Sequence, residues 1–182
     1  MVNNLIFNPG RRAIHYNLLR NEWSGQLFQT GQLAIVGNVM RHGPDTPPDT
    51  PLFTMLGDAD LELDLRDNLA LNLANEHVAL HANASRGAQV RFTQQPLPGD
   101  VTVRPVTAVA RDLPQAVGAR PWDRDALDER VLADMARGVG RIIDSETDNP
   151  LGGWVPQVPT VRRFEETNWH LDRMRPKVPD SS

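Results

Sequence analysis

The chain has 182 residues, of which 40% are hydrophobic, with 19 basic and 23 acidic residues and a formal net charge of -4. This composition fits one domain with an apolar core and argues against disorder of the whole chain. Because acidic residues outnumber basic ones, the composition does not favour nucleic acid binding. The absence of cysteine excludes a disulfide framework and a thiolate metal site, and no apolar run approaches the roughly 20 residues that cross a bilayer.

The first part of the chain consists of short strand-forming runs separated by turns. Residues 61–65 alternate apolar and acidic side chains, and residues 78–80, 90–92 and 101–103 are short runs of strand formers. Turn formers stand at residues 8–10, 43–45, 57–58 and 98–100. Because no helix of about ten residues separates these strands, an α/β sheet is not expected. A β-solenoid and a sandwich are the two alternatives.

An asparagine leads into a short apolar strand three times, at Asn4, Asn38 and Asn68, which lie 34 and then 30 positions apart. Equivalent residues of successive solenoid coils lie above one another, so this spacing favours a stacked β-solenoid. Asparagine suits a left-handed corner between strands, and stacked amides can hydrogen-bond along the solenoid axis; ligand binding would instead need outward side chains. Because Asn4 stands at the very start, we expect a fragment of a longer protein whose N-terminal coils are missing.

The composition changes after this β part, and two helices are predicted. Residues 108–116 form a short helix before Gly118, and a second helix begins at a cap provided by Asp123 or Asp125 and ends at Gly138. One apolar face of the second helix, which we expect to be buried against the β part, carries Leu127, Val131 and Met135. From residue 141 onward the chain reads as an extended tail. The expected organisation is a β part over residues 1–105 and a helix and tail over residues 106–182.

The best candidates for ligand binding are Arg11, Arg12 and Tyr16, near Arg20 and the pair Arg41–His42. Guanidinium groups match carboxylates in bidentate fashion, and an adjacent aromatic ring can stack on a sugar, so the cluster suits an acidic polysaccharide. The alternative is a solvated loop between two strands.

Acidic residues are frequent between positions 45 and 67, where Asp45, Asp49, Asp58, Asp60, Asp64 and Asp67 occur. Calcium needs several converging oxygens, and these carboxylates lack any EF-hand spacing, so no metal site is expected from them. We expect Asp64 and Asp67 to lie on the solvent face of a strand.

Several segments together resemble the C-terminal half of bacterial pectate lyase-like proteins of polysaccharide lyase family 1. The most specific is the order of glycines, acidic residues and tryptophan near the C-terminus, and the matching segments are residues 2–6, 36–39, 43–46, 117–128 and 140–154. The resemblance implies a partial right-handed parallel β-helix with a short C-terminal helix and tail, a secreted or periplasmic location, and calcium-dependent eliminative cleavage of a polygalacturonate-like polysaccharide in the complete protein.

The same resemblance limits what this chain can do. In the family, the calcium-binding aspartates and the basic arginine precede the stretch that corresponds to residues 2–4, so no position here inherits a catalytic or metal-binding role. The one role that the resemblance transfers to this chain is substrate binding at the edge of a cleft, and the residues to which it applies are Arg11, Arg12 and Tyr16. We therefore expect an inactive part of a polysaccharide-degrading lyase that binds no calcium by itself; the alternative is a non-catalytic β-solenoid that binds glycans or has a structural role.

Overall fold

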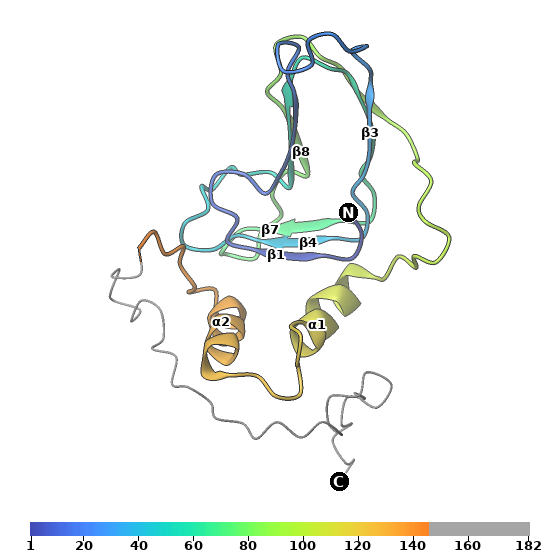
Figure 1. The fold of residues 1–182 in the computed structure, drawn as a ribbon. Helices are drawn as coiled ribbons and strands as arrows, with labels where there is room; N and C mark the ends of the chain where they lie inside the picture. The colour runs from blue at the N-terminus through green and yellow to red at the C-terminus, as the bar shows by residue number, and fades with distance from the viewer. Residues whose placement is uncertain (146–182) are drawn as a thin grey trace.

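The computed structural model describes residues 1–145, which form nine short strands and two helices (Figure 1). The strands are β1 (Leu5–Phe7), β2 (Ile14–Leu18), β3 (Gly31–Ala34), β4 (Val39–Arg41), β5 (Phe53–Gly57), β6 (Leu61–Asp64), β7 (Leu69–Leu71), β8 (His81–Asn83) and β9 (Val90–Phe92). The helices are α1 (Val106–Ala116) and α2 (Ala126–Arg137). The tail was predicted from residue 141 onward, and its part from residue 146, including Trp154, lies outside the described residues.

The strands build three parallel sheets in the orders β1-β4-β7, β2-β5-β8 and β3-β6-β9. The chain visits the sheets in turn, so every third strand returns to the same sheet. We call each pass of three strands a circuit: the first is β1 to β3, the second β4 to β6 and the third β7 to β9. This β-helix-like arrangement confirms the prediction of stacked, short parallel strands and excludes the antiparallel sandwich.

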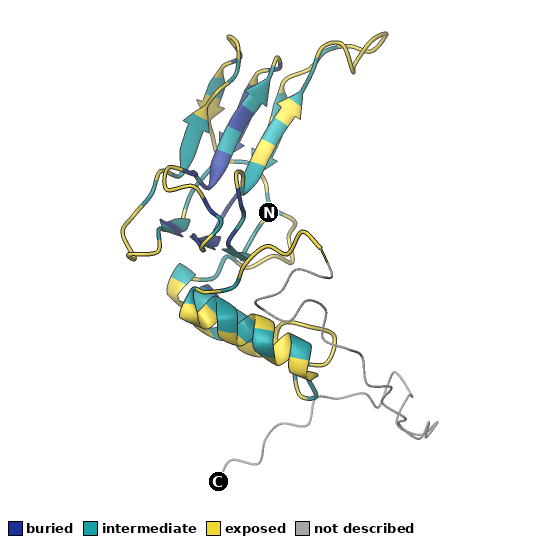
Figure 2. Cartoon of the chain, turned by 90° about the vertical axis from the view of Figure 1, so that its left-hand side faces the viewer, coloured by how far each residue is buried: buried dark blue, intermediate teal, exposed yellow. Residues whose placement is uncertain are grey.

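Side chains that point between the sheets form the main apolar core. In the second circuit Phe53, Met55, Leu61 and Leu63 have no exposed surface. Their counterparts in the outer circuits, such as Ile14 and Val90, are only partly buried. Figure 2 shows the same gradient, with buried residues gathered in the middle of the stack. The interior is therefore densest where a circuit has neighbours on both sides.

The recurring asparagines stack as a hydrogen-bonded ladder. The Asn4 amide nitrogen donates to Asn38 Oδ1 over 2.8 Å, and the Asn38 amide nitrogen donates to Asn68 Oδ1 over 3.0 Å. Each acceptor also receives a backbone N–H from the asparagine one circuit earlier, over 3.0 and 2.9 Å. This confirms the amide-stacking interpretation of the repeat.

The left-handed corners, in contrast, do not lie at these asparagines. They lie one position earlier, at Asn3, Gly37 and Asp67, with φ of 56°, 67° and 55°. The preceding residue makes the sharp turn, and the asparagine that follows is free to direct its amide into the stack. The sequence prediction assigned both tasks to one residue.

Both predicted helices are confirmed. Helix α1 spans Val106–Ala116, and the fully buried Val109 lies where this helix contacts β1 and β4. Helix α2 begins after Asp125, whose carboxylate accepts the backbone N–H of Leu127 and of Asp128 over 2.9 Å each. It ends at Gly138, whose φ of 71° is the left-handed conformation that closes a helix. Both helices lie beside the β1-β4-β7 sheet (Figure 1).

The predicted burial of the apolar face of α2 is wrong for the described residues. No residue of α2 is buried, and Val131 has 55% of its surface exposed. Leu127 and Met135 are half-buried. Helix α1, and not α2, makes the main helix contacts with this sheet, at β1 and β4, and it contributes the buried Val109.

Three further expectations need correction. Asp64 is buried, with 3% exposure, because Arg66 Nε and the backbone N–H of Gln95 donate to its carboxylate. Residues 101–103 form no strand, since the Asn3 side chain bonds the backbone of Thr102 and Arg104 in place of a neighbouring strand. Residues 78–80 are likewise irregular, and the strand begins at His81.

Candidate functional site

The first candidate site is the turn between β1 and β2, which carries Arg11 and Arg12. Both side chains are exposed, and neither makes an ion pair or a hydrogen bond with the described residues. Other described arginines are held by carboxylates, such as Arg104 by Asp112 and Arg137 by Asp134. The turn therefore presents two adjacent cationic groups whose donors are free for an anion.

Tyr16 lies in β2, the strand that follows this turn, and its side chain points toward the interior. Along β2, Ile14, Tyr16 and Leu18 are half-buried, whereas His15 and Asn17 are exposed. The Tyr16 ring reaches to the backbone of Gly31, so close that a side chain at this position would collide with the tyrosine hydroxyl. Burial raises the pKa of the Tyr16 phenol. Tyr16 is thus a packing residue of the first circuit, and His15 is the β2 side chain that follows the arginines on the outer face.

Two further basic residues of the predicted cluster, Arg20 and His42, contact other parts of the chain. The Arg20 guanidinium lies 4.2 Å from the centre of the Phe28 ring. His42 is buried, and its Nε2 lies 2.8 Å from the carbonyl oxygen of Thr50. His42 therefore links the end of β4 to Thr50 in the connection between β4 and β5.

The start of the β1–β2 connection is held by a junction centred on Asn8 and Asp45. Asn8 is buried with φ of 48°, and its side-chain oxygen accepts from the backbone N–H of Asp45 over 2.9 Å and from Thr46 Oγ1 over 3.1 Å. Its amide nitrogen donates to Asp45 Oδ2 over 2.9 Å and to the carbonyl of Gly140 over 3.0 Å. This Asn8–Asp45 junction fixes where the chain enters the arginine turn.

Asp45 also attaches the segment after α2 to the β part. Its carboxylate accepts from Arg141 Nη2 over 2.9 Å and from the backbone N–H of Ile142 over 2.7 Å. These donors, with the Asn8 amide as the strongest contributor, lower the pKa of Asp45. The carboxylate is therefore engaged in structure and is not placed to act as a base.

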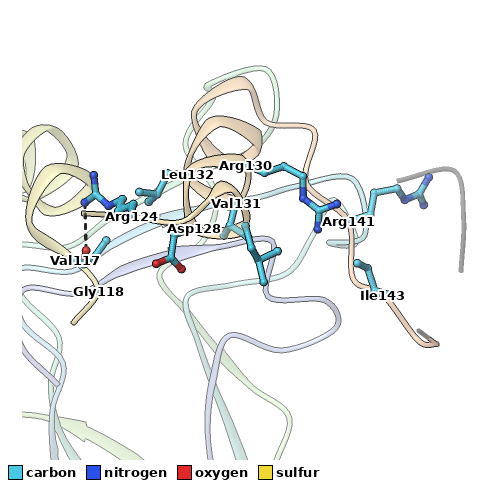
Figure 3. A pocket seen from close by; sticks show the side chains of 10 residues that line it. Val117, Gly118, Arg124, Asp128, Arg130, Val131, Leu132, Arg141 and Ile143 are labelled. Carbon is cyan, nitrogen blue, oxygen red and sulfur yellow. Dashed lines mark hydrogen bonds between the residues drawn. The ribbon is translucent and has the colours of Figure 1, made fainter. Parts of the chain in front are cut away.

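A second candidate site is an open groove of about 530 Å³ beside α2 (Figure 3). Its lining is mainly apolar, with Leu127 and Val131 from α2 and Val117 from the end of α1, while basic side chains stand around it. Arg124 belongs to this lining, but its guanidinium donates to the carbonyl of Val117 over 3.2 Å and to two further carbonyls. Arg141 is paired with Asp45. Two of the arginines that line the groove, Arg124 and Arg141, are thus already bound to other groups of the chain.

A calcium site does not fit the described residues. No group of three acidic or histidine side chains that could hold a metal ion occurs among residues 1–145. The individual aspartates serve other partners: Asp58 accepts the backbone N–H of Arg20, and Asp60 accepts that of Gln89. No helix in this part of the chain is long and apolar enough to cross a membrane.

Sequence reasoning missed the Asn8–Asp45 junction. Residues 8–10 and 43–45 were recognisable as turns, but nothing in the sequence indicates that these turns bond to each other and to Gly140.

Comparison of the chain with protein-family models, curated proteins and solved structures gives no match.

Proposed function

We propose that this chain is the non-catalytic part of a pectate lyase-like right-handed parallel β-helix and that it binds an acidic polysaccharide through Arg11 and Arg12. The β-helical winding is supported by three parallel sheets that the chain visits in rotation and by the Asn4–Asn38–Asn68 ladder. The kind of ligand is supported by the resemblance of the sequence to polysaccharide lyases, which also supports a role outside the cell.

The single observation that carries the binding proposal is the unpaired state of Arg11 and Arg12. An exposed arginine commonly finds a carboxylate nearby, as Arg91 does at Glu62. In the turn between β1 and β2 no such partner is in reach among the described residues, although the turn itself is fixed by the Asn8–Asp45 junction. Two adjacent guanidinium groups without a partner favour a ligand that carries several carboxylates, such as a polyuronate.

Cleavage is not part of the proposal. Eliminative cleavage needs a base for the proton beside the uronate carboxylate and cationic charge to stabilise the enolate-like intermediate. The Asp45 carboxylate is engaged in structural bonds, and His42 is buried against Thr50. Arg11 and Arg12 supply charge for binding, and the proposal gives no catalytic role to the exposed His15 that follows them in β2.

The test is binding of oligogalacturonate, measured by titration calorimetry at low salt, for the wild type and for the double variant Arg11→Ala/Arg12→Ala. We expect the double variant to bind at least about tenfold more weakly, since each charge-assisted contact contributes about 1 kcal/mol or more. Arg86→Ala is the matched control, because Arg86 is also exposed and has no partner among the described residues but lies in the β8–β9 turn.

Equal loss in Arg86→Ala would indicate non-specific attraction and would refute the site. A neutral oligosaccharide should not bind, because the proposed contacts are ionic. Release of unsaturated product, followed by its ultraviolet absorbance, should not occur with this chain. If product forms and a chelator stops it, the non-catalytic assignment is wrong.

A further inference from the structure

We propose that the loop between β2 and β3 is a second contact site for the acidic polysaccharide, at which a sugar ring lies against the indole of Trp23. The inference rests on the polysaccharide binding proposed above and extends it from the β1–β2 turn to the other end of β2. Three observations carry it: the length of the loop, its exposed apolar side chains, and the bonds that hold it in one conformation.

The β2–β3 loop is longer than its counterparts in the other two circuits. It spans residues 19–30, whereas the loops after β5 and β8 span residues 58–60 and 84–89. The second circuit makes the same turn between the same two sheets with residues 58–60, so most of residues 19–30 are not needed for the fold. The loop lies at the end of the sheets away from both helices (Figure 1). Residues inserted into one repeat of a stacked protein form loops on one face, which is often the binding face.

The loop exposes large apolar side chains. Trp23 has 43% of its surface exposed, and Leu27 has 81%, the highest value for any large hydrophobic residue among residues 1–145. One exposed apolar side chain on a protein surface needs no explanation, but neighbouring ones on one loop indicate a contact surface. The loop therefore has the character of a binding element and not of a simple connection.

Hydrogen bonds hold the loop in one conformation. The backbone N–H of Trp23 donates to the carbonyl of Arg20 over 3.3 Å, and that of Gln26 donates to the carbonyl of Trp23 over 3.2 Å. Trp23 Nε1 donates to the carbonyl of Leu27 over 3.0 Å. At the base of the loop, the backbone N–H of Arg20 donates to Asp58 Oδ2 in the second circuit over 3.0 Å. The indole is thus ordered before a ligand arrives, and because its N–H is already bonded, it offers apolar ring surface.

The occupant that fits both ends of β2 is an elongated polyuronate. Arg11 and Arg12 precede this strand, the loop follows it, and the outward side chains of His15 and Asn17 lie between them. Each unit of a polyuronate carries a carboxylate for a guanidinium group and a ring face of C–H groups that can lie against an aromatic ring. The aromatic contact adds to the ionic contacts and does not replace them.

An anionic lipid surface is the main alternative occupant of an exposed apolar loop. Such a surface attracts loops in which basic residues accompany the apolar ones. Residues 19–30 carry one charge of each sign, Arg20 and Glu22, and the Arg20 guanidinium lies 4.2 Å from the centre of the Phe28 ring. The charge of the loop therefore favours the polysaccharide over a lipid surface.

The first experiment measures the binding of two galacturonate oligomers by titration calorimetry. Digalacturonate is too short to reach both ends of β2, a strand of five residues and about 17 Å, whereas an oligomer of about ten units exceeds that length. For Trp23→Ala we expect at least about fivefold weaker binding of the long oligomer and unchanged binding of digalacturonate. This loss should stay the same at high salt, whereas the effect of Arg11→Ala/Arg12→Ala should shrink, because salt screens ionic contacts.

Two further variants show whether the ring itself makes the contact. Trp122→Ala is the matched control: Trp122 is 41% exposed but lies in the connection between α1 and α2, so this variant should bind like the wild type. Trp23→Phe keeps an aromatic ring in the loop and should bind the long oligomer within about twofold of the wild type. The long oligomer should change the tryptophan fluorescence of the wild type and of Trp122→Ala, but not that of Trp23→Phe.

The possible failures of the two proposals differ. If Trp23→Ala binds the long oligomer like the wild type while Arg11→Ala/Arg12→Ala does not, the loop is no contact site, and binding through the arginines stands. If the wild type binds neither oligomer, polysaccharide binding itself is wrong and the inference falls with it. An equal loss in Trp122→Ala also overturns the inference. So does binding to vesicles of anionic phospholipid that Trp23→Ala abolishes, because the occupant is then a lipid surface.

Discussion

The three-sheet part and helix α2 are stabilised in different ways. Each circuit of the β part buries apolar side chains between sheets, and the interior side chains of the second circuit have no exposed surface. Helix α2 buries no residue, and it is positioned by its Asp125 cap and by the bonds of the following segment to Asp45 (Figure 2). The difference shows that the core of this molecule is formed by stacked circuits, whereas α2 is attached to them by polar contacts. Four substitutions test this comparison, from the largest expected effect to the smallest.

The largest effect is expected from Phe53→Ala. Phe53 has no exposed surface and packs between sheets in the second circuit, where its ring is stacked on His81 at 6.0 Å. Removing the ring leaves a cavity that the neighbouring circuits cannot fill, and we expect a loss of about 3–5 kcal/mol in the free energy of unfolding. Urea denaturation measures it.

The matched control is Phe92→Ala. Phe92 lies in β9 at the end of the stack and is 59% exposed, so its removal should have less than about 1 kcal/mol of effect. Equal losses at the two phenylalanines would contradict the view that burial is concentrated in the second circuit.

Asn38→Ala should have the next largest effect. The side chain of Asn38, the middle asparagine of the ladder, is fully buried; it accepts two hydrogen bonds from Asn4 and donates one to Asn68. Its removal leaves buried polar groups without partners, for which we expect a loss of about 2–3 kcal/mol. Asn4→Ala should be milder by at least about 1 kcal/mol, because the side-chain oxygen of Asn4 accepts no hydrogen bond from the described residues. If thermal unfolding shows that Asn4→Ala loses more stability than Asn38→Ala, the expectation that the middle asparagine contributes more than the first is wrong.

Asp45→Asn tests the polar attachment of α2. At neutral pH we expect a loss of about 1–2 kcal/mol, since the carboxylate accepts from Asn8, Arg141 and Ile142. The pKa of Asp45 is lowered in the fold below its ordinary value of 3.8. The stability that this shift contributes is present above the unfolded pKa and is lost as the pH falls through the folded pKa.

The difference between wild type and Asp45→Asn should therefore shrink when unfolding is measured below about pH 3.8 rather than at pH 7. A difference that stays constant over this range would show that the charge of Asp45 is unimportant. Asp49→Asn in the same loop is the control, because Asp49 is exposed and makes no ion pair among the described residues; it should change neither value.

The parts of the fold that follow from local or periodic signals could be predicted from the sequence. The spacing of Asn4, Asn38 and Asn68 indicated the stack, and Asp125 and Gly138 marked the ends of α2, because each signal lies within one element or repeats along the chain. The Asn8–Asp45 junction could not be predicted, since its groups are 37 and 132 positions apart and no pattern links them. Substrate binding by Arg11, Arg12 and Tyr16 stays a prediction, although Tyr16 points to the interior.

The smallest effect is expected from Val131→Ser, at the residue where an amphipathic pattern predicted burial. Apolar spacing on a helix indicates a face but not whether a partner surface is available, and here the main helix contacts with the sheet are those of α1. With 55% of its surface exposed, Val131 should lose less than about 0.5 kcal/mol on replacement by serine. Val109→Ser in α1 is the matched comparison: this valine is fully buried, and burying a hydroxyl there should lower the free energy of unfolding by about 2 kcal/mol or more. A large loss at Val131 in denaturant titration would mean that α2 is held by its apolar face after all, and the division between stacked core and polar attachment would then have to be abandoned.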